Sequence, residues 1–186
     1  MLSNEDREYQ LVVSPLINWL QAQKPGWIVH HPKYHTSARG WDIEAWRENE
    51  YLLIEAKYIA ASSISSFSGL VSAPLAMRAQ HWNDPSWCCW AVGIKPQIEN
   101  RGRHVYQIFF DYLARNVEFW KHYSEDLRMK YIFFVQEGDV TMVSFSDFLD
   151  MTKLYSDRTD KKTPCKARRQ IAEDLLRIYL KRGISN

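Results

Sequence analysis

The sequence predicts a single mixed α/β domain over residues 1–186. A helical apolar pattern opens the chain, strand-like runs follow it, and a basic, mostly helical segment ends it. In order, the first half predicts a helix, a three-stranded meander, a helix and a strand; the second half predicts a hairpin and further helices. A chain of 186 residues lies in the usual range of one domain and is long enough for a sizeable core.

The first helix is predicted by apolar residues that recur at helical spacing, namely Tyr9, Val12, Val13, Leu16, Ile17 and Leu20. Ser3 is a suitable N-cap for this helix. Pro15 is expected to kink it or to start a second helix, because proline lacks a backbone donor. After the break at Pro25-Gly26, the run Trp27–His30 predicts a short strand.

The remaining elements of the first half are two strand-like runs around a polar turn, a helix and a buried strand, expected at 41–46, 51–58, 60–80 and 87–94. Gly69 and Pro74 should perturb the helix. The second half predicts one amphipathic helix over 105–120, hairpin strands at 131–135 and 140–145, a helix from Ser146 to Tyr155 and a last helix from Thr163-Pro164 to about Arg182. We therefore expect a core at about residues 4–95 and a C-terminal extension at about 96–186.

The composition is that of an ordinary soluble globular protein, with 46% apolar and 25% charged residues. There is no run of about 18 apolar residues, so no membrane span is expected. The acidic, polar start is the reverse of a signal peptide. Two of the three cysteines, Cys88 and Cys89, are adjacent in an apolar stretch, which favours buried thiols in a reducing, cytoplasmic protein.

The charge is divided unevenly along the chain. Residues 157–186 carry nine Lys/Arg and four Asp/Glu, a net charge of +5, whereas residues 1–156 carry a net charge of −3. This asymmetry is typical of an anion-binding appendage, although a solvated surface helix explains it equally well. The candidate phosphate contacts are Lys161, Lys162, Lys166, Arg168, Arg169, Arg101 and Arg103.

The predicted hairpin of residues 41–58 carries the residues with the clearest chemistry. Alternate residues of a strand share a face, so Glu55 and Lys57 lie opposite the apolar face of Leu52 and Ile54. A connecting loop with an even number of residues would place Asp42 across from Glu55. An odd loop would put the two carboxylates on opposite faces. The alternative is the solvated face of an edge hairpin with ordinary surface charges.

Two carboxylates roughly 5 Å apart repel by about 3 kcal/mol at an effective dielectric constant near 20. A hard divalent cation between Asp42 and Glu55 would turn this repulsion into binding, since Mg²⁺ prefers oxygen ligands. It would also acidify a water molecule, and Lys57 could orient that water or stabilise charge on a phosphate. Gly40 leaves space for a substrate backbone to approach.

Gly40-Trp41-Asp42, followed after twelve residues by Glu55-Ala56-Lys57, resembles the signature of the PD-(D/E)XK (restriction-endonuclease-like) nuclease superfamily. The order helix, three-stranded meander, helix and strand is similar to its common core. Trp41 departs from the signature, which has proline at this position. The resemblance covers about residues 4–95.

The resemblance implies that Asp42, Glu55 and the backbone carbonyl of Ala56 bind Mg²⁺ or Mn²⁺. In several relatives the first helix adds a glutamate, which by position would be Glu8, with Glu5 as the fallback. We therefore expect a metal-dependent nuclease, an endodeoxyribonuclease that hydrolyses phosphodiester bonds of DNA. The alternative is a non-catalytic nucleic-acid-binding or assembly subunit with the same fold. The small net charge of +2 favours pairing with a second copy or a partner subunit.

Other polar and aromatic residues have plainer roles as alternatives to a role at the site. Glu44 shares the face of Asp42 and is either a further ligand or a solvated side chain. The histidines lack cysteine or carboxylate partners at zinc-ligand spacing, although one near a cleft could contact phosphate; they are His30, His31 and His35. Three tryptophans are expected in the core rather than as base-stacking platforms, namely Trp82, Trp87 and Trp90.

Overall fold

One mixed sheet organises the protein. The computed structural model describes residues 4–31, 41–59, 67–94 and 105–183, with side chains up to Leu180. Its six strands lie in the order β1-β2-β3-β4-β5-β6. They are β1 Ile28–His30, β2 Ile43–Arg47, β3 Glu50–Ile59, β4 Trp87–Ile94, β5 Met129–Gln136 and β6 Asp139–Ser144. The expected α/β class is confirmed.

The sheet combines a parallel centre with antiparallel edges. Strands β3, β4 and β5 run parallel to one another, and β1, β2 and β6 pair antiparallel to their neighbours. The C-terminal hairpin of β5 and β6 therefore extends the same sheet that begins with β1. A parallel centre requires crossover connections, and the segments that hold the helices between β3 and β5 supply them.

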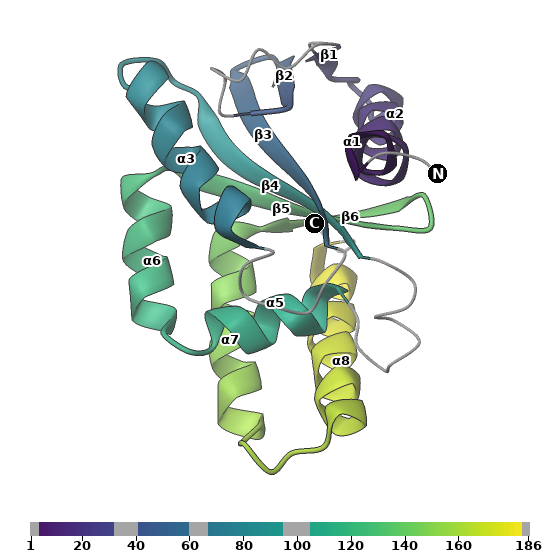
Figure 1. Cartoon of the computed structure of the whole chain (residues 1–186), viewed down its shortest axis with the longest axis vertical. Coiled ribbons are helices and arrows are strands. Elements are labelled where there is room, and N and C mark those ends of the chain that lie inside the picture. Colours follow the sequence, from purple (N-terminus) through teal and green to yellow (C-terminus); the bar gives the residue numbers. More distant parts are fainter. Residues whose placement is uncertain (1–3, 32–40, 60–66, 95–104, 184–186) are drawn as a thin grey trace.

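Helices cover the two faces of the sheet (Figure 1). One face is covered by α1 Asn4–Glu8, η1 Tyr9–Val13 and α2 Ser14–Ala22. The other is covered by α3 Ser68–Gln80, α5 Val105–Leu113, α6 Val117–Asp126, α7 Phe145–Arg158 and α8 Cys165–Gly183. Each face has its own apolar core. The smaller core joins the N-terminal helices to β2–β5, and the larger joins the sheet to the helices that follow β3.

The N-terminal helical region accommodates Pro15 by means of a π-helical segment, η1, that lies just before it. The N–H of Ser14 donates to the carbonyl of Tyr9, five residues back. Proline has no N–H to donate, and its ring collides with the carbonyl four residues earlier in a regular α-helix. The wider turn of η1 removes this conflict, and α2 then begins with Pro15 in its first turn. The expected disturbance at Pro15 is therefore a π-turn between two α-helices.

The hairpin of β2 and β3 has the register that an even loop requires. Arg47 pairs with Glu50 across the two-residue loop, and Ile43 pairs with Ile54 at the other end. Glu48 has a φ of 52°, the left-handed conformation typical of such tight hairpin loops. The even-loop alternative is confirmed.

Two sequence-based boundaries in the second half are wrong. The single helix expected over 105–120 is two helices, because Asn116 accepts a hydrogen bond from the N–H of Phe119 (3.1 Å) and starts α6 as its N-cap. Ser144, rather than Ser146, caps α7, since its hydroxyl accepts from the N–H of Asp147 (3.1 Å). The last helix, α8, follows Thr163-Pro164 as expected.

Some expectations lie outside the described residues. These are the N-cap at Ser3, the start of the helix expected over 60–80, and the positions of Arg101, Arg103, Gly40 and His35. Among the described helices, none has the length and apolar character needed to cross a membrane.

Gly93 of β4 provides a test of the contact between the N-terminal helix and the sheet. A Cβ atom there would lie 2.8 Å from Cγ2 of Val12, closer than real side chains pack. We expect Gly93→Ala to lower the free energy of unfolding by about 1–3 kcal/mol, the usual cost of overpacking. Urea unfolding measures this loss. Val12→Ala should destabilise less in the Gly93→Ala background than alone; equal effects in both backgrounds would contradict the contact.

Candidate active site

Asp42, Glu55 and Lys57 lie on one face of the β2–β3 hairpin. Leu52 and Ile54 belong to the core beneath the N-terminal helices, whereas Leu53 belongs to the core on the α3 side. By strand alternation, Glu55 and Lys57 therefore lie on the face that α3 covers. Strand β3 is third in the sheet and has neighbours on both sides. The alternative of a solvated edge hairpin is therefore wrong.

Asp42 is buried where β2 begins, with only 8% of its surface exposed. Its N–H donates to the carbonyl of Ile54 (2.9 Å), and its Oδ2 accepts from the N–H of Ala56 (2.7 Å). The carboxylate thus bonds to the backbone of β3 just beyond the last regular pair, Ile43 with Ile54. These two bonds hold Asp42 next to Glu55.

Glu55 lies in an environment that disfavours its negative charge. Burial, together with the nearby charge of Asp42, raises its pKa from 4.5 to about 9. Lys57 acts in the opposite direction, and Glu8 adds further repulsion. Among the residues that the structure describes, none donates a hydrogen bond to the Glu55 carboxylate. An acid in this state gains strongly from a bound cation.

Glu8 reaches the same site from the last residue of α1. Its Oε2 accepts from the N–H of Tyr58 (2.9 Å) and lies 3.5 Å from Nζ of Lys57. A carboxylate far away in the sequence is thereby tied to the strand that carries Glu55 and Lys57. Glu5, one turn earlier, is exposed.

Lys57 lies between Glu8 and the first turn of α3. A Cβ added to Gly69 would be 3.9 Å from Cδ and 4.0 Å from Cε of Lys57, so the lysine stem runs along this glycine. The lysine side chain is 38% exposed. Its ammonium group is therefore oriented by a carboxylate while it remains accessible to a ligand from solvent.

Glu44 and the nearby histidines contact protein groups around the site. Oε1 of Glu44 accepts from the indole N–H of Trp41 (2.9 Å), and its Oε2 lies 3.8 Å from Nδ1 of His30. Nδ1 of His31 lies 2.8 Å from the carbonyl oxygen of Asp42, and the His31 ring packs 5.3 Å from that of Tyr9. These contacts help to fix the start of β2.

The three tryptophans differ in exposure. Trp90 is 1% exposed and lies in the larger core as expected. Trp87 is half-buried beneath the cationic groups of Arg128 and Lys130, 4.7 and 4.9 Å from its ring. Trp82 is 71% exposed, so its assignment to the core is wrong. Its position just after the end of α3, in a polar segment, was the available sign of exposure.

The candidate phosphate contacts that the structure describes, Lys161, Lys162, Lys166, Arg168 and Arg169, are not at the carboxylates. Lys161 and Lys162 lie in the turn between α7 and α8, at the end of the helical layer farthest from the sheet (Figure 1). Lys166 is exposed in the first turn of α8. Arg168 pairs with Asp111 (3.2 Å) and Arg169 with Glu173 (2.7 Å).

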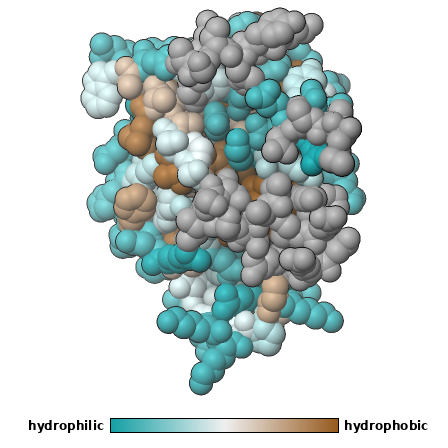
Figure 2. All heavy atoms as spheres, in the orientation of Figure 1, coloured by the Kyte–Doolittle hydropathy of each residue, from teal (hydrophilic) through white to brown (hydrophobic). Residues whose placement is uncertain are grey.

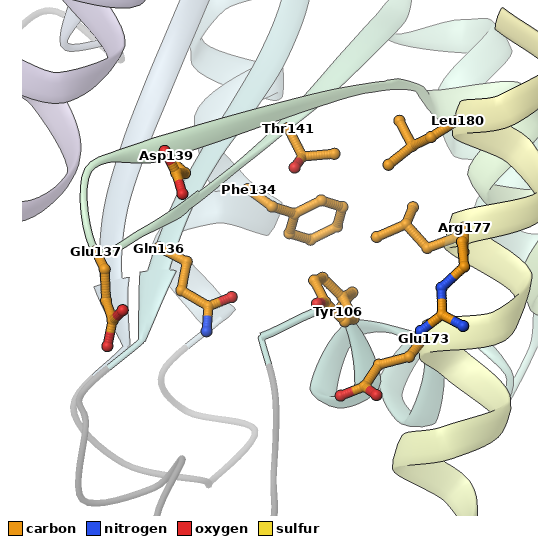
Figure 3. Close-up of a pocket in the computed structure, with 10 residues that line it drawn as sticks. Tyr106, Phe134, Gln136, Glu137, Asp139, Thr141, Glu173, Arg177 and Leu180 are labelled. Atoms are coloured by element: carbon orange, nitrogen blue, oxygen red, sulfur yellow. The ribbon is translucent and has the colours of Figure 1, made fainter.

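The concavity shown in Figure 3 is a separate feature. It has a volume of about 510 Å³ and lies between the β5–β6 hairpin, Tyr106 and α8. Acidic side chains line it, namely Glu137, Asp139 and Glu173, with Arg177 nearby. None of the four candidate catalytic residues lines it.

Replacement of Asp42 should separate its structural role from its charge. Asparagine keeps an oxygen that accepts from the N–H of Ala56, whereas alanine leaves this buried donor without its partner. We expect Asp42→Ala to be less stable than Asp42→Asn by about 1–3 kcal/mol, the usual cost of an unsatisfied buried group. Chemical unfolding in EDTA measures the difference. Equal stabilities would contradict the bond.

The raised pKa of Glu55 predicts a pH-dependent stability. The folded state binds a proton that the unfolded state releases above pH 4.5, so wild-type stability should fall as the pH rises from about 4.5 to 9. Glu55→Gln should remove this dependence. In EDTA at pH 8 its Tm should exceed that of wild type by several degrees, since 1 kcal/mol shifts Tm by about 2–4 °C at this size.

Differential scanning fluorimetry across this pH range tests the Glu55 prediction. Glu125→Gln, an exposed carboxylate on α6, is the matched control and should follow the wild-type profile. Parallel profiles for Glu55→Gln and wild type would show that Glu55 titrates normally.

Comparison with known proteins identifies no relative. No protein-family model, no curated protein and no solved structure matches the chain. Within the described residues there is also no preformed group of three or more His, Cys, Asp or Glu side chains arranged to hold a metal ion. The function is therefore inferred from the geometry of Asp42, Glu55, Lys57 and Glu8.

Proposed function

We propose that this protein is a metal-dependent nuclease, an endodeoxyribonuclease that hydrolyses phosphodiester bonds of DNA. The observation that carries the proposal is the gathering of Asp42, Glu55 and Lys57 on one buried face, with Glu8 bonded beside them. The order of elements from α1 to β4 supports a restriction-endonuclease-like core. A purely structural role would not explain a buried carboxylate held next to another without a cation.

The residues at the site fit Mg²⁺ or Mn²⁺. Oxygen donors from Asp42, Glu55 and the carbonyl of Ala56 would hold the ion, and hard cations prefer such ligands. The burial of Glu55 beside Asp42, which raises the pKa of Glu55, favours a cation, because opposite charge would allow this carboxyl to ionise at neutral pH. When bound, such an ion acidifies water and polarises a phosphate oxygen. Only two side-chain carboxylates are needed, since Mg²⁺ keeps several waters.

The protein's own residues then have distinct roles. Asp42, anchored by the N–H of Ala56, provides a fixed oxygen, and Glu55 provides the second. The Lys57 ammonium stabilises negative charge that develops on the phosphate or orients the attacking water, and Glu8 positions Lys57. In the reaction, the water oxygen forms a bond to phosphorus while one P–O ester bond breaks. The attacking water gives up one proton and the leaving oxygen takes up one, so the products are a phosphate monoester and a free hydroxyl.

Cleavage of a defined panel of nucleic acids tests this proposal. Plasmid, linear duplex, single strand, branched junction and RNA would be incubated with Mg²⁺, Mn²⁺ or EDTA. We expect metal-dependent cutting of DNA, lowered about 100-fold or more by Asp42→Asn and by Lys57→Ala, which remove charge at the reacting phosphate. Lys121→Ala, an exposed lysine on α6, is the matched control and should cut normally.

A binding measurement completes the test without turnover. Mn²⁺ should raise the Tm of wild type but not that of Asp42→Asn or Glu55→Gln, since both remove a proposed ligand charge. A protein that binds nucleic acid, cuts none of the panel and gains no stability from Mn²⁺ would be a non-catalytic binding or assembly subunit instead.

A further inference from the structure

A groove of about 610 Å³ lies on the helical side of the protein, between α5 and the turn that joins α7 to α8. We call it the α5–α8 groove. Asp111 and Tyr112 of α5 and Arg115, just after this helix, line one wall, and Ser156, Lys161 and Arg168 line the other. Hydrophilic residues cover the lower end of the molecule in Figure 2, where α7 and α8 meet.

The turn between α7 and α8 is held by Asp160. Its Oδ1 accepts from the N–H groups of Lys162 (2.9 Å) and Thr163 (2.8 Å) and from the hydroxyl of Thr163 (2.9 Å). The hydrogen bond from the Thr163 side chain, followed by that from the Lys162 backbone, lowers the pKa of Asp160. This carboxylate is therefore occupied by local donors, and the adjacent lysines are carried on an ordered turn.

The other acid of the groove is occupied as well. Asp111 Oδ1 accepts from the hydroxyl of Tyr155 (2.6 Å) and from Nη1 of Arg168 (3.2 Å). Arg168 also donates to the carbonyls of Thr163 (3.0 Å) and Asp160, so it ties the turn to α5. Arg168 thus holds the turn against α5, and its role as a phosphate contact stays a prediction.

The remaining cations are available for a ligand. Arg115 and Lys161 line the groove, Lys162 and Lys166 lie beside it, and all four are exposed. Within the described part of the chain, none of the four forms an ion pair. Residues 157–169 carry six Lys/Arg and two Asp/Glu, a net charge of +4. The charged residues that line the groove are three cations and two carboxylates, a net charge of +1, and Lys162 and Lys166 follow Lys161 closely in the chain. This excess of cations fits a polyanion.

The aromatic rings in the groove are not placed to stack with bases. Phe67 is 3% exposed, and its ring stacks on that of Tyr112 with centroids 4.7 Å apart. The Tyr112 ring also contacts Trp120 at 5.3 Å. The third ring, that of Tyr155, is 1% exposed and stacks on that of Phe110 with centroids 5.1 Å apart. Because all three rings are used within the protein, the groove offers charge to a backbone rather than a platform to bases.

The groove adjoins the candidate active site through the start of α3. Phe67, the N-cap of this helix, lines the groove, and Gly69 two residues later lies against the stem of Lys57. The stem of Lys57 and the part of the groove lined by Phe67 therefore lie at the same end of α3.

We propose that the α5–α8 groove binds the phosphodiester backbone of the nucleic acid substrate, away from the bond that is cut, through Arg115 and Lys161. This inference rests on the proposed nuclease function for the identity of the polyanion. Contacts of this kind are independent of sequence and sensitive to salt. The groove anchors the substrate, while the specificity of cutting lies elsewhere.

Binding measured without cleavage tests the groove. Asp42→Asn would serve as the background, with a fluorescein-labelled duplex of mixed sequence, in EDTA, and anisotropy recorded at several NaCl concentrations. We expect Arg115→Ala/Lys161→Ala to weaken binding about 10-fold or more at low salt. The slope of log K against log salt should become smaller by about 2, since each lost phosphate contact removes about 0.9.

A matched pair separates local contacts from net charge. Lys121→Ala/Arg177→Ala removes the same two charges from exposed positions outside the groove and should bind like the background. Three outcomes would overturn the proposal. Both double variants could lose DNA affinity equally, the groove variant could lose none, or the Asp42→Asn background could fail to bind DNA. Preferential binding of polyglutamate at Arg115 and Lys161 would also overturn it, in favour of an acidic protein partner.

The outcome for the groove is independent of catalysis. Loss of binding in the groove pair, with no metal-dependent cutting by wild type, would sustain the groove and reject the nuclease. Metal-dependent cutting by wild type, with unchanged DNA binding by Arg115→Ala/Lys161→Ala, would support the nuclease and reject the groove.

Discussion

The hydrogen bond from the N–H of Ala56 to Asp42 is the interaction on which the site depends. It continues the pairing of β2 and β3 past its last regular pair, and so links the register of the hairpin to the position of a carboxylate. The same bond uses one oxygen of Asp42 to hold it against a strand that carries Glu55. The electrostatic conflict between the two acids is thus a consequence of backbone geometry.

The surroundings of the hairpin determine how strongly this geometry affects the charges of Glu55 and Lys57. Strand β3 is central, and helices cover both of its faces, so Glu55 is removed from water that would otherwise solvate its charge. Lys57 remains 38% exposed, and its stem runs along Gly69 of α3. The ammonium group of Lys57 lies beside the acid pair of Asp42 and Glu55. This arrangement suits an anionic ligand that a cation bridges to the two carboxylates.

The sequence was most informative where a simple rule determines side-chain direction. Strand alternation and an even loop sufficed to bring Asp42 to the face of Glu55. The break at Asn116 was missed because the apolar pattern continues across it, although asparagine can cap a helix. The exposure of Trp82 and the burial of Glu55 depend on how α3 packs. Local sequence patterns carry no information about that packing. The internal pairing of Arg168 likewise required the position of α5.

The π-helical segment has a consequence for the evolution of the site. A π-turn holds one residue more than the α-helical path it replaces, and each residue of an α-helix turns it by about 100°. Glu8 directly precedes this segment, so deletion of one residue from η1 would rotate its carboxylate away from Tyr58 and Lys57. The alignment of Glu8 is therefore set by a single extra residue, which Pro15 makes favourable to retain. Substitution of Pro15 is therefore expected to shift the side chain of Glu8, two helical turns away.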